Sequence, residues 1–296
     1  MPWNKLIVVG TLLGLALIAP AQSPPRSKPA ESKTKVDPQG KVDAMEIKEL
    51  VQRIRKKDWN VMEPPNRIPP NAAPELVPLL TDADQEVREL AVAAIDKTTG
   101  PEAKQGLFKA LSDRNEVVRG AAARNLSHHC GPGDVDALVN QLRAHKDEYV
   151  REQLALLLGK LGQRPAMRPL QERFVAEEWP HTKHALSLAL TRLGDPDHRQ
   201  AYIGRLGQPD PKDRVAALQD LLYLEDKTLA KNVKPLLGDE REGKNVGPSH
   251  GPYWIRVCDV AINVLDIVLG HPFKFEVRGN KRYSPQELNE AKSVIQ

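Results

Sequence analysis

The sequence predicts an all-α fold, a right-handed superhelical solenoid of about six helical pairs. One apolar helical pattern recurs along most of the chain at nearly constant spacing. A regular period of this size is typical of repeat proteins, in which each repeat buries its apolar stripes only against its neighbours. Aromatic residues make up only 4% of the chain, and the small and medium apolar residues that dominate suit closely packed helices better than strands.

The chain begins with the layout of a signal peptide. Lys5 precedes an apolar run from Leu6 to Ala19, and Pro20 and Ala21 follow it. The run is shorter than the roughly 20 residues that cross a bilayer, so we expect cleavage after Ala21 and removal of residues 1–21. No cysteine follows the run to carry a lipid. The sequence therefore predicts a periplasmic or secreted product with no stable membrane span after signal removal.

Two segments are expected before the repeats. Residues 22–43 contain four prolines and many charges, with Val36 and Val42 as their only large apolar side chains, which predicts a disordered linker. Residues 44–73 are predicted to form an N-terminal capping helix and a proline-rich lead-in. The helix is indicated by apolar side chains at helical spacing, Ile47, Leu50, Val51 and Ile54.

The repeat domain is predicted over residues 74–270. Each of six repeats has a basic marker residue at the start of an apolar helical stretch: Arg88, Arg119, Arg151, Lys183, Arg214 and Arg256. Four of the five intervals are 31 or 32 residues and the last is 42, which indicates an insertion near residues 239–250. Side chains three, four and seven positions after the marker are mostly apolar and share one helix face. A second apolar stretch precedes each marker, so every repeat is expected to be a helix, a turn and a helix.

Two stretches show the pattern most clearly, LSDRNEVVRGAAARNL and AHKDEYVREQLALLLGKLG. Their order of Leu, a polar turn with Asp, Val-Arg, small residues, Leu and Gly resembles HEAT repeats of the short phycobilisome-lyase type, here in a bacterial exported chain. The resemblance covers about residues 74–270 and implies an α solenoid. It implies little about function, because such repeats occur in binding scaffolds, lyase subunits and regulators. The fourth repeat departs most, with Trp179-Pro180 in its turn and Lys183 as its marker.

Residues 271–296 are predicted to be a C-terminal tail and a capping helix. The stretch HPFKFEVRGNKRY breaks the helical period and is expected to form an extended segment or a hairpin. Ser284, Pro285 and Glu287 then supply a cap, a first-turn proline and a capping-box acid for a last helix.

The recurring arginines have two interpretations, a basic row for an anionic ligand or an internal ladder. In the ladder, each arginine hydrogen-bonds the acids of the turns and ties neighbouring repeats together through charge-assisted bonds. The resemblance to HEAT repeats implies the same ladder, and we favour it. The predicted ladder residues are Arg88, Arg119, Arg151 and Arg214 with Asp82, Asp113, Asp147 and Asp210.

A partner surface is predicted on the concave side, which the second helices line in a HEAT solenoid. Positions one and five after the marker point away from the packed stripe. The predicted partner-binding row is Glu89, Arg124, Glu152, His184, Leu188, Val215 and Gln219. The alternative is that this row is an ordinary solvated surface.

Metal-ligating and catalytic patterns are weak in this sequence. His128-His129-Cys130 and the pair His181 and His184 offer donor atoms, but a metal site needs three or four ligands at matched spacing. We therefore predict no metal and no cofactor.

The sequence contains no His-Glu dipeptide, the iron-ligand pair of HEAT-repeat hydroxylases, and no Gly-x-Ser-x-Gly or His-Glu-x-x-His motif. We therefore expect that this protein is not an enzyme. The alternative is a lyase-like enzyme or enzyme subunit that binds a chromophore, glycan or other small ligand on the concave face.

The net charge argues against nucleic acid as a partner, and the positions of the cysteines argue against a disulfide. The 43 basic and 39 acidic residues give a formal net charge of only +4, whereas nucleic-acid binders usually show a strong basic excess, so nucleic acid is not an expected partner. Cys130 and Cys258 are expected to lie four repeats apart, on the order of 30–40 Å at 8–10 Å per helix, which is too far for a disulfide. The sequence predicts a monomeric, non-catalytic protein-binding or scaffolding chain whose partner is another protein.

Overall fold

The computed structural model describes residues 44–64, 66–245 and 254–295, so the predicted signal peptide and linker lie outside the described residues. The chain divides into two compact bodies. We call them the N-terminal body, which ends at Tyr202, and the C-terminal body, which starts at Ile203. The division falls inside the region of predicted repeats. None of the helices in the described ranges is long and apolar enough to cross a membrane.

The N-terminal body is built from helical pairs, and both helices of the first four predicted repeats are present. The helix α1 precedes them over Ala44–Arg55 and buries Ile47, Leu50 and Ile54. The first helices of the pairs are α2 (Ala73–Leu76), continued by a 3-10 segment over Val77–Thr81, then α4 (Pro101–Ala110), α6 (Val135–Ala144) and α8 (Met167–Ala176). The second helices are α3 (Gln85–Ile95), α5 (Glu116–His129), α7 (Glu148–Leu161) and α9 (Pro180–Arg192). Shorter 3-10 segments cover Trp59–Met62, Pro132–Asp134 and Arg164–Ala166.

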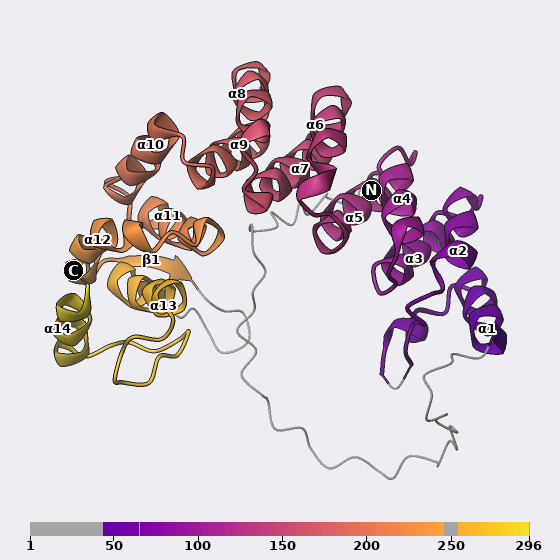
Figure 1. Cartoon of the computed structure of the whole chain (residues 1–296). Coiled ribbons are helices and arrows are strands. Elements are labelled where there is room, and N and C mark those ends of the chain that lie inside the picture. The colour runs from indigo at the N-terminus through magenta and orange to yellow at the C-terminus, as the bar shows by residue number, and fades with distance from the viewer. Residues whose placement is uncertain (1–43, 65, 246–253, 296) are drawn as a thin grey trace, which may run out of the picture. The chain divides into compact units, whose positions relative to one another are not determined.

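The second helices lie side by side along one side of this body. Figure 1 shows α5, α7 and α9 in a row, with α4, α6 and α8 on the opposite side. The side chains predicted to form the buried helix face, three, four and seven positions after the marker, are buried: in α7 these are Leu154, Ala155 and Leu158, all fully buried. Burying one leucine contributes about 1.5–3 kcal/mol, and small residues such as alanine allow neighbouring helices to approach closely. The all-α fold of stacked helical pairs that the sequence predicts is confirmed.

Side-chain caps fix where the second helices begin. Asp84, Asn115 and Asp147 each accept a hydrogen bond from a backbone N–H in the first turn of α3, α5 and α7, at 2.8–3.0 Å. Such caps satisfy backbone donors that have no partner inside the helix. At the other end of α7, Gly162 adopts a left-handed conformation with φ of 68°, which glycine tolerates without strain.

The C-terminal body contains the last two predicted repeats and the tail. The helix α10 (Pro196–Leu206) crosses the boundary between the bodies. The other helices are α11 (Pro211–Leu224), α12 (Ala230–Val233) with a preceding 3-10 segment over Lys227–Leu229 and a following one over Lys234–Gly238, α13 (Val257–Leu269) and α14 (Pro285–Val294). The predicted capping box of α14 is present, with Ser284 and Glu287 bonding each other's backbone N–H groups.

The insertion in the sixth repeat forms part of a β-hairpin that the sequence analysis did not predict. Strand β1 (Glu242–Asn245) pairs antiparallel with β2 (Trp254–Arg256). In contrast, residues 271–283, where an extended segment or hairpin was expected, form no helix or strand. They are held by side chains instead: the Tyr283 backbone N–H donates to Asp259 at 3.0 Å, and Tyr283 is 2% exposed.

Candidate functional site

The recurring arginines connect consecutive repeats. Arg88 Nε and Nη2 donate to the two carboxylate oxygens of Asp113 in the next turn, at 2.7 and 3.0 Å. The remaining nitrogen, Nη1, donates to the backbone oxygens of Asp82 and Ala83 in its own turn. Arg119 repeats the arrangement, with Asp147 as its carboxylate and the backbone oxygen of Asp113 at 2.9 Å.

Four members of the predicted ladder behave differently from the expectation. The carboxylate of Asp82 accepts the backbone N–H of Asp84, because each arginine reaches forward to the following turn and the first turn has no arginine before it. The acid that Arg151 reaches is Glu177, which accepts from its Nε and Nη2 at 2.8 Å each. Asp210 caps α11 through the N–H of Lys212, and the carboxylate that accepts from Arg214 is Asp239 at 2.8 Å.

Two of the ladder arginines are buried, Arg119 and Arg214 are partly exposed at 22% and 23%, and each is paired with a carboxylate of the chain. Arg88 is 3% and Arg151 4% exposed. Burial by itself would raise the pKa of Glu177, but hydrogen bonds from Arg151 and Arg173 outweigh it and lower that pKa to about 2. Arginines held in this way are not available to an anionic ligand. The ladder therefore fixes the geometry of the repeats rather than forming a binding site.

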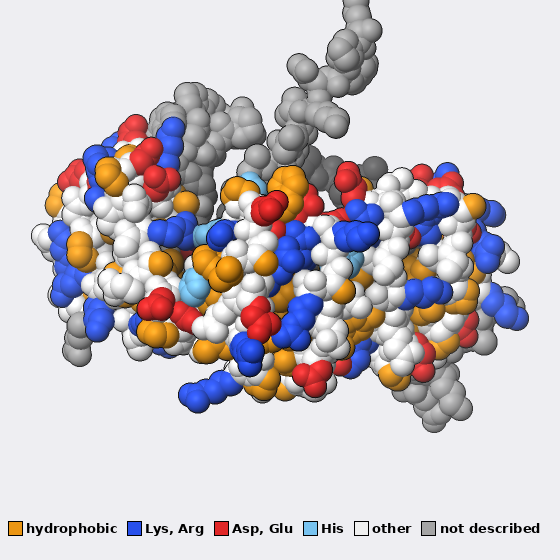
Figure 2. Space-filling view, turned by 90° about the horizontal axis from the view of Figure 1, so that it is seen from above, with side chains coloured by type: hydrophobic (Ala, Val, Ile, Leu, Met, Phe, Trp, Pro, Cys, Tyr) orange, Lys and Arg blue, Asp and Glu red, His pale blue; other side chains and the backbone are white. Residues whose placement is uncertain are grey.

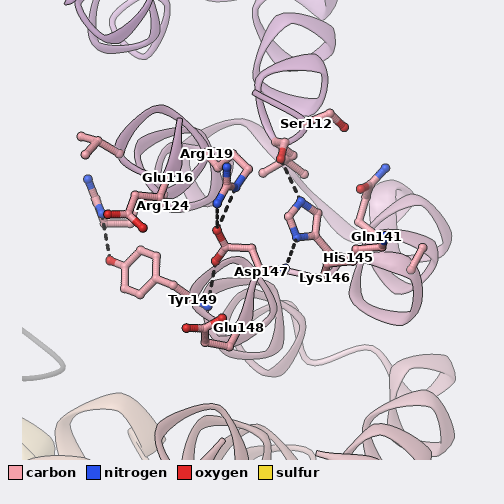
Figure 3. Close-up of a pocket in the computed structure, with 14 residues that line it drawn as sticks. Ser112, Glu116, Arg119, Arg124, Gln141, His145, Lys146, Asp147, Glu148 and Tyr149 are labelled. Atoms are coloured by element: carbon pink, nitrogen blue, oxygen red, sulfur yellow. Dashed lines mark hydrogen bonds and ion pairs between the residues drawn. The ribbon is translucent and has the colours of Figure 1, made fainter. Parts of the chain in front are cut away.

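A groove of about 850 Å³ lies where α5 and α7 begin and α4 and α6 end. Figure 3 shows its walls, with Tyr149, Arg124 and Glu116 on one side and Gln141 and Lys146 on the other. The fourteen lining residues are Leu111, Ser112, Glu116, Val117, Arg119, Gly120, Arg124, Gln141, Ala144, His145, Lys146, Asp147, Glu148 and Tyr149. We call it the α5/α7 groove.

Two large apolar side chains of this groove face solvent. Val117 is 43% and Tyr149 38% exposed, and each is the second residue of its helix. Arg124 Nη1 donates to the Tyr149 hydroxyl at 2.8 Å, and its guanidinium carbon lies 5.7 Å from the ring centroid. A Cβ atom at Gly120 would lie 3.0 Å from the ring, so glycine lets Tyr149 lie closer to α5 than a larger residue would. Tyr149 is thus held in place with its hydroxyl satisfied and part of its ring exposed.

The polar groups of the groove do not form a catalytic arrangement. The His145 ring is occupied by the turn: its Nε2 pairs with the Leu111 carbonyl at 2.8 Å and its Nδ1 accepts the Asp147 N–H at 3.1 Å. The carboxylates of Glu116 and Glu148 have no hydrogen-bond or ion-pair partner, and neither has the Lys146 ammonium. Among these lining residues no nucleophile is hydrogen-bonded to a general base.

Only part of the predicted partner-binding row is exposed. Arg124 is exposed and lines the groove, and Glu89, Glu152, His184 and Gln219 are partly exposed. Leu188, at 2% exposure, is not available to a partner, because α9 buries a wider face than its marker pattern indicates, including Ala185, Ala189 and Thr191.

Val215 was also wrongly placed on the partner surface. It is 3% exposed, because β1 covers α11 and Gly243 lies so close that an added Cβ would be 2.7 Å from the Val215 side chain. The hairpin was not predicted, so its covering of this position was not either. Sequence reasoning also missed Val117 and Tyr149; the available signal was an apolar residue two positions before the marker, where a turn is normally polar.

The histidines of the two clusters lie near carboxylates of the chain itself. His128 Nδ1 lies 2.7 Å and His129 Nε2 3.7 Å from the same oxygen of Asp96. Burial raises the pKa of the Cys130 thiol to about 12, so it is not a thiolate at neutral pH. On α7, burial raises the pKa of Glu152 despite the nearby His181 and His184 of α9. Within the described ranges, no three His, Cys, Asp or Glu side chains are placed to hold a metal ion.

Comparison with known proteins supports the repeat assignment. Residues 65–127 match the family model of HEAT repeats, which confirms the predicted resemblance over that stretch. No curated protein sequence matches the chain.

Solved structures with a similar course of the chain include the complex of CpcE and CpcF of phycocyanin lyase from Nostoc sp. PCC7120. It is 17% identical, with a TM-score of 0.47 and coverage of 92% of this chain and 98% of that one. The YibA protein of Escherichia coli is 15% identical, with a TM-score of 0.46 and coverage of 90% and 99%. An engineered protein is 16% identical, with a TM-score of 0.35 and coverage of 68% and 98%. These likenesses are too low to carry function to this chain.

Proposed function

We propose that this chain is a non-catalytic, protein-binding repeat scaffold and that its partner docks in the α5/α7 groove. The observation that carries the proposal is the exposed, fixed ring of Tyr149 beside Val117. Tyrosine, tryptophan and arginine are the residues that most often dominate binding energy at protein interfaces. The groove offers tyrosine and arginine together with an aliphatic neighbour.

The rigidity of the groove supports the same function. Arg119 and Asp147, which bond across its floor, fix the starts of α5 and α7 relative to each other. Gly120 and Arg124 fix the ring of Tyr149. A surface already held in its binding conformation loses little conformational entropy when a partner docks. The arrangement therefore suits recognition of a macromolecule better than chemistry, for which the lining residues offer no positioned nucleophile and base.

The experiment is affinity capture from native cell extract with purified chain, its Tyr149→Ala variant and a Val175→Ala variant. Val175 on α8 is 81% exposed and outside the groove, so it is a matched control. We expect one co-purifying protein that is retained by the control and lost, by at least about tenfold, with Tyr149→Ala. Capture that is the same with all three chains would contradict docking in the groove, provided that circular dichroism shows equal folding.

We further propose that the chain acts outside the cytoplasm. The supporting observation is the signal-peptide layout of residues 1–21, with the apolar run before Pro20 and Ala21. Fractionation of native cells followed by intact-mass measurement tests this proposal. A mature chain beginning at Gln22 in the periplasmic or extracellular fraction is expected, and a full-length chain in the cytoplasmic fraction would overturn it.

A further inference from the structure

Three consecutive second helices share a pattern at the point where they begin. Glu116 and Val117 start α5, Glu148 and Tyr149 start α7, and the dipeptide Glu178-Trp179 immediately precedes α9. In each case a glutamate is followed by a large apolar side chain that faces solvent; Trp179 is 54% exposed. We call these six residues the Glu-apolar edge.

The three carboxylates are available to a ligand. No hydrogen bond or ion pair engages the side chains of Glu116, Glu148 or Glu178. Several neighbouring cations are engaged: Arg119 binds Asp147, Arg124 donates to Tyr149, and Lys183 lies 5.0 Å from the ring centroid of Phe174. Lys146 has no such partner, and Figure 3 places it beside His145, on the wall of the groove opposite Glu116.

Local helix energetics explain only half of the pattern. An acid in the first turn is favoured by the helix dipole, which accounts for Glu116 and Glu148 without any ligand. The dipole does not explain an exposed apolar side chain directly after the glutamate in three consecutive repeats. Exposed apolar residues at the same end of three neighbouring second helices indicate a surface that is covered in the functional state.

We propose that the Glu-apolar edge binds an extended segment of the partner protein in which a basic and an adjacent apolar side chain recur every third residue. The inference rests on the proposed protein-binding function and specifies its partner. Apolar side chains of the segment pack on Val117, Tyr149 and Trp179, and its lysines or arginines pair with the three glutamates. Neighbouring helices lie about 8–10 Å apart, and a segment in the extended polyproline II conformation advances about 3.1 Å per residue with three residues per turn, so every third side chain meets a successive repeat on the same face.

The net charge of the chain makes this proposal selective. A chain of formal net charge +4 repels basic peptides at long range, so unspecific electrostatic attraction cannot produce their binding. A basic segment binds only where a local group of unpaired carboxylates outweighs the overall charge. The Glu-apolar edge provides such a group next to apolar surface.

The test uses fluorescence anisotropy with three labelled twelve-residue peptides and the full chain. The peptides are four copies of Lys-Val-Thr, of Lys-Gly-Thr, which lacks the apolar side chain, and of Glu-Val-Thr, which reverses the charge. The first peptide is expected to bind at least about tenfold more tightly than the other two. Equal or tighter binding of the acidic peptide would overturn the proposal.

A matched pair of triple variants locates the site. The variant E116K/E148K/E178K should weaken binding of the Lys-Val-Thr peptide by at least about tenfold. The control variant E75K/E102K/D136K makes the same charge change at exposed positions of the first helices α2, α4 and α6, and its affinity should stay within about twofold. Equal loss in the two variants would show binding that depends on total charge alone and would overturn the proposal.

Two further outcomes separate this inference from the proposed function. If no peptide binds while Tyr149→Ala still abolishes capture of a partner, the basic and apolar chemistry is wrong and the docking groove stands. If a synthetic peptide of residues 22–43 displaces the Lys-Val-Thr peptide at lower concentration than the unlabelled peptide itself, the occupant is this chain's own segment, and the assignment to a partner is overturned.

Discussion

Arg88 holds Asp113 by two parallel hydrogen bonds, of 2.7 Å from Nε and 3.0 Å from Nη2, across the boundary between two repeats. Both side chains are almost completely buried, at 3% and 6% exposure. A paired geometry of this kind is among the strongest that side chains form. It makes the ladder the part of the structure that responds most sharply to substitution.

Replacing Arg88 with leucine should destabilise the N-terminal body by about 3–5 kcal/mol, because it leaves the buried carboxylate of Asp113 without a counter-charge. Urea unfolding followed by circular dichroism measures the loss. Arg168→Leu is the control, since Arg168 pairs with Glu172 but is 87% exposed, and it should leave the unfolding midpoint unchanged. A similar loss in the two variants would contradict a special role for the ladder.

Acid should weaken the ladder at Glu177. Its pKa is lowered from 4.5 to about 2 in the folded chain, so the unfolded state takes up a proton first as the pH falls. The ionised Glu177 carboxylate therefore contributes about 3 kcal/mol to the free energy of unfolding. This contribution is fully present above about pH 5 and is lost between about pH 4.5 and pH 2. Urea unfolding across this range should show a smaller pH dependence for Glu177→Gln. Glu116→Gln, at an unpaired surface carboxylate, should keep the wild-type profile.

Gly120→Ala should separate binding from stability. Alanine favours a helix over glycine by about 1 kcal/mol, and the ring of Tyr149 is exposed enough to move aside, so the melting temperature should stay equal or rise. The added Cβ lies 3.0 Å from the present ring position and displaces it. Partner capture should fall several-fold. Gly204→Ala in α10, where the Cβ meets nothing within 4 Å, should leave capture unchanged.

Gly243→Ala tests the packing of the hairpin on α11. Its Cβ would lie 2.7 Å from the Pro211 carbonyl oxygen and from the Val215 side chain, and backbone atoms cannot move away easily. We expect a loss of about 1–3 kcal/mol in thermal or urea unfolding. Gly238→Ala, which meets no atom within 4 Å, is the matched control. An unchanged stability of Gly243→Ala would mean that β1 does not cover α11 in solution.

Both cysteines should react slowly with a thiol reagent in the native chain. Cys258 is fully buried, and burial raises its pKa to about 11, while that of Cys130 is about 12. Reaction requires the thiolate, which is scarce at pH 8 at these pKa values. Two thiols per chain should titrate within minutes in denaturant and far fewer without it. Finding no thiols in denaturant would demonstrate a disulfide.

The helices were predictable because their signals are local. Asp84, Asn115 and Asp147 are strong caps wherever they precede an apolar helical stretch, and the marker spacing fixes the number of pairs. The β-hairpin was not predictable, because Glu242–Asn245 carries no alternating apolar pattern and pairs with residues on the far side of the insertion.

The site residues depend on contacts between repeats, which spacing alone does not encode. Tyr149 is held by Gly120 and Arg124 from the preceding repeat. Leu188 is buried by packing around α9, although its position in the repeat points outward in neighbouring repeats. Glu177 accepts from Arg151 at a turn where the pattern indicated no aspartate. To predict any of these contacts, one would need to know how two helices or turns are placed relative to each other.

The forward direction of the ladder has a consequence for how such a chain can change its length. Arg88 needs only a carboxylate in the turn that follows it, and both Asp113 and Asp147 present that carboxylate to the arginine before them. Excising the stretch from Asp113 to Lys146 would give Arg88 the turn of Asp147 in exchange, with no buried charge left alone. Gain or loss of one whole repeat is therefore electrostatically neutral at the junction, whereas loss of a turn carboxylate alone would leave the preceding guanidinium without its counter-charge.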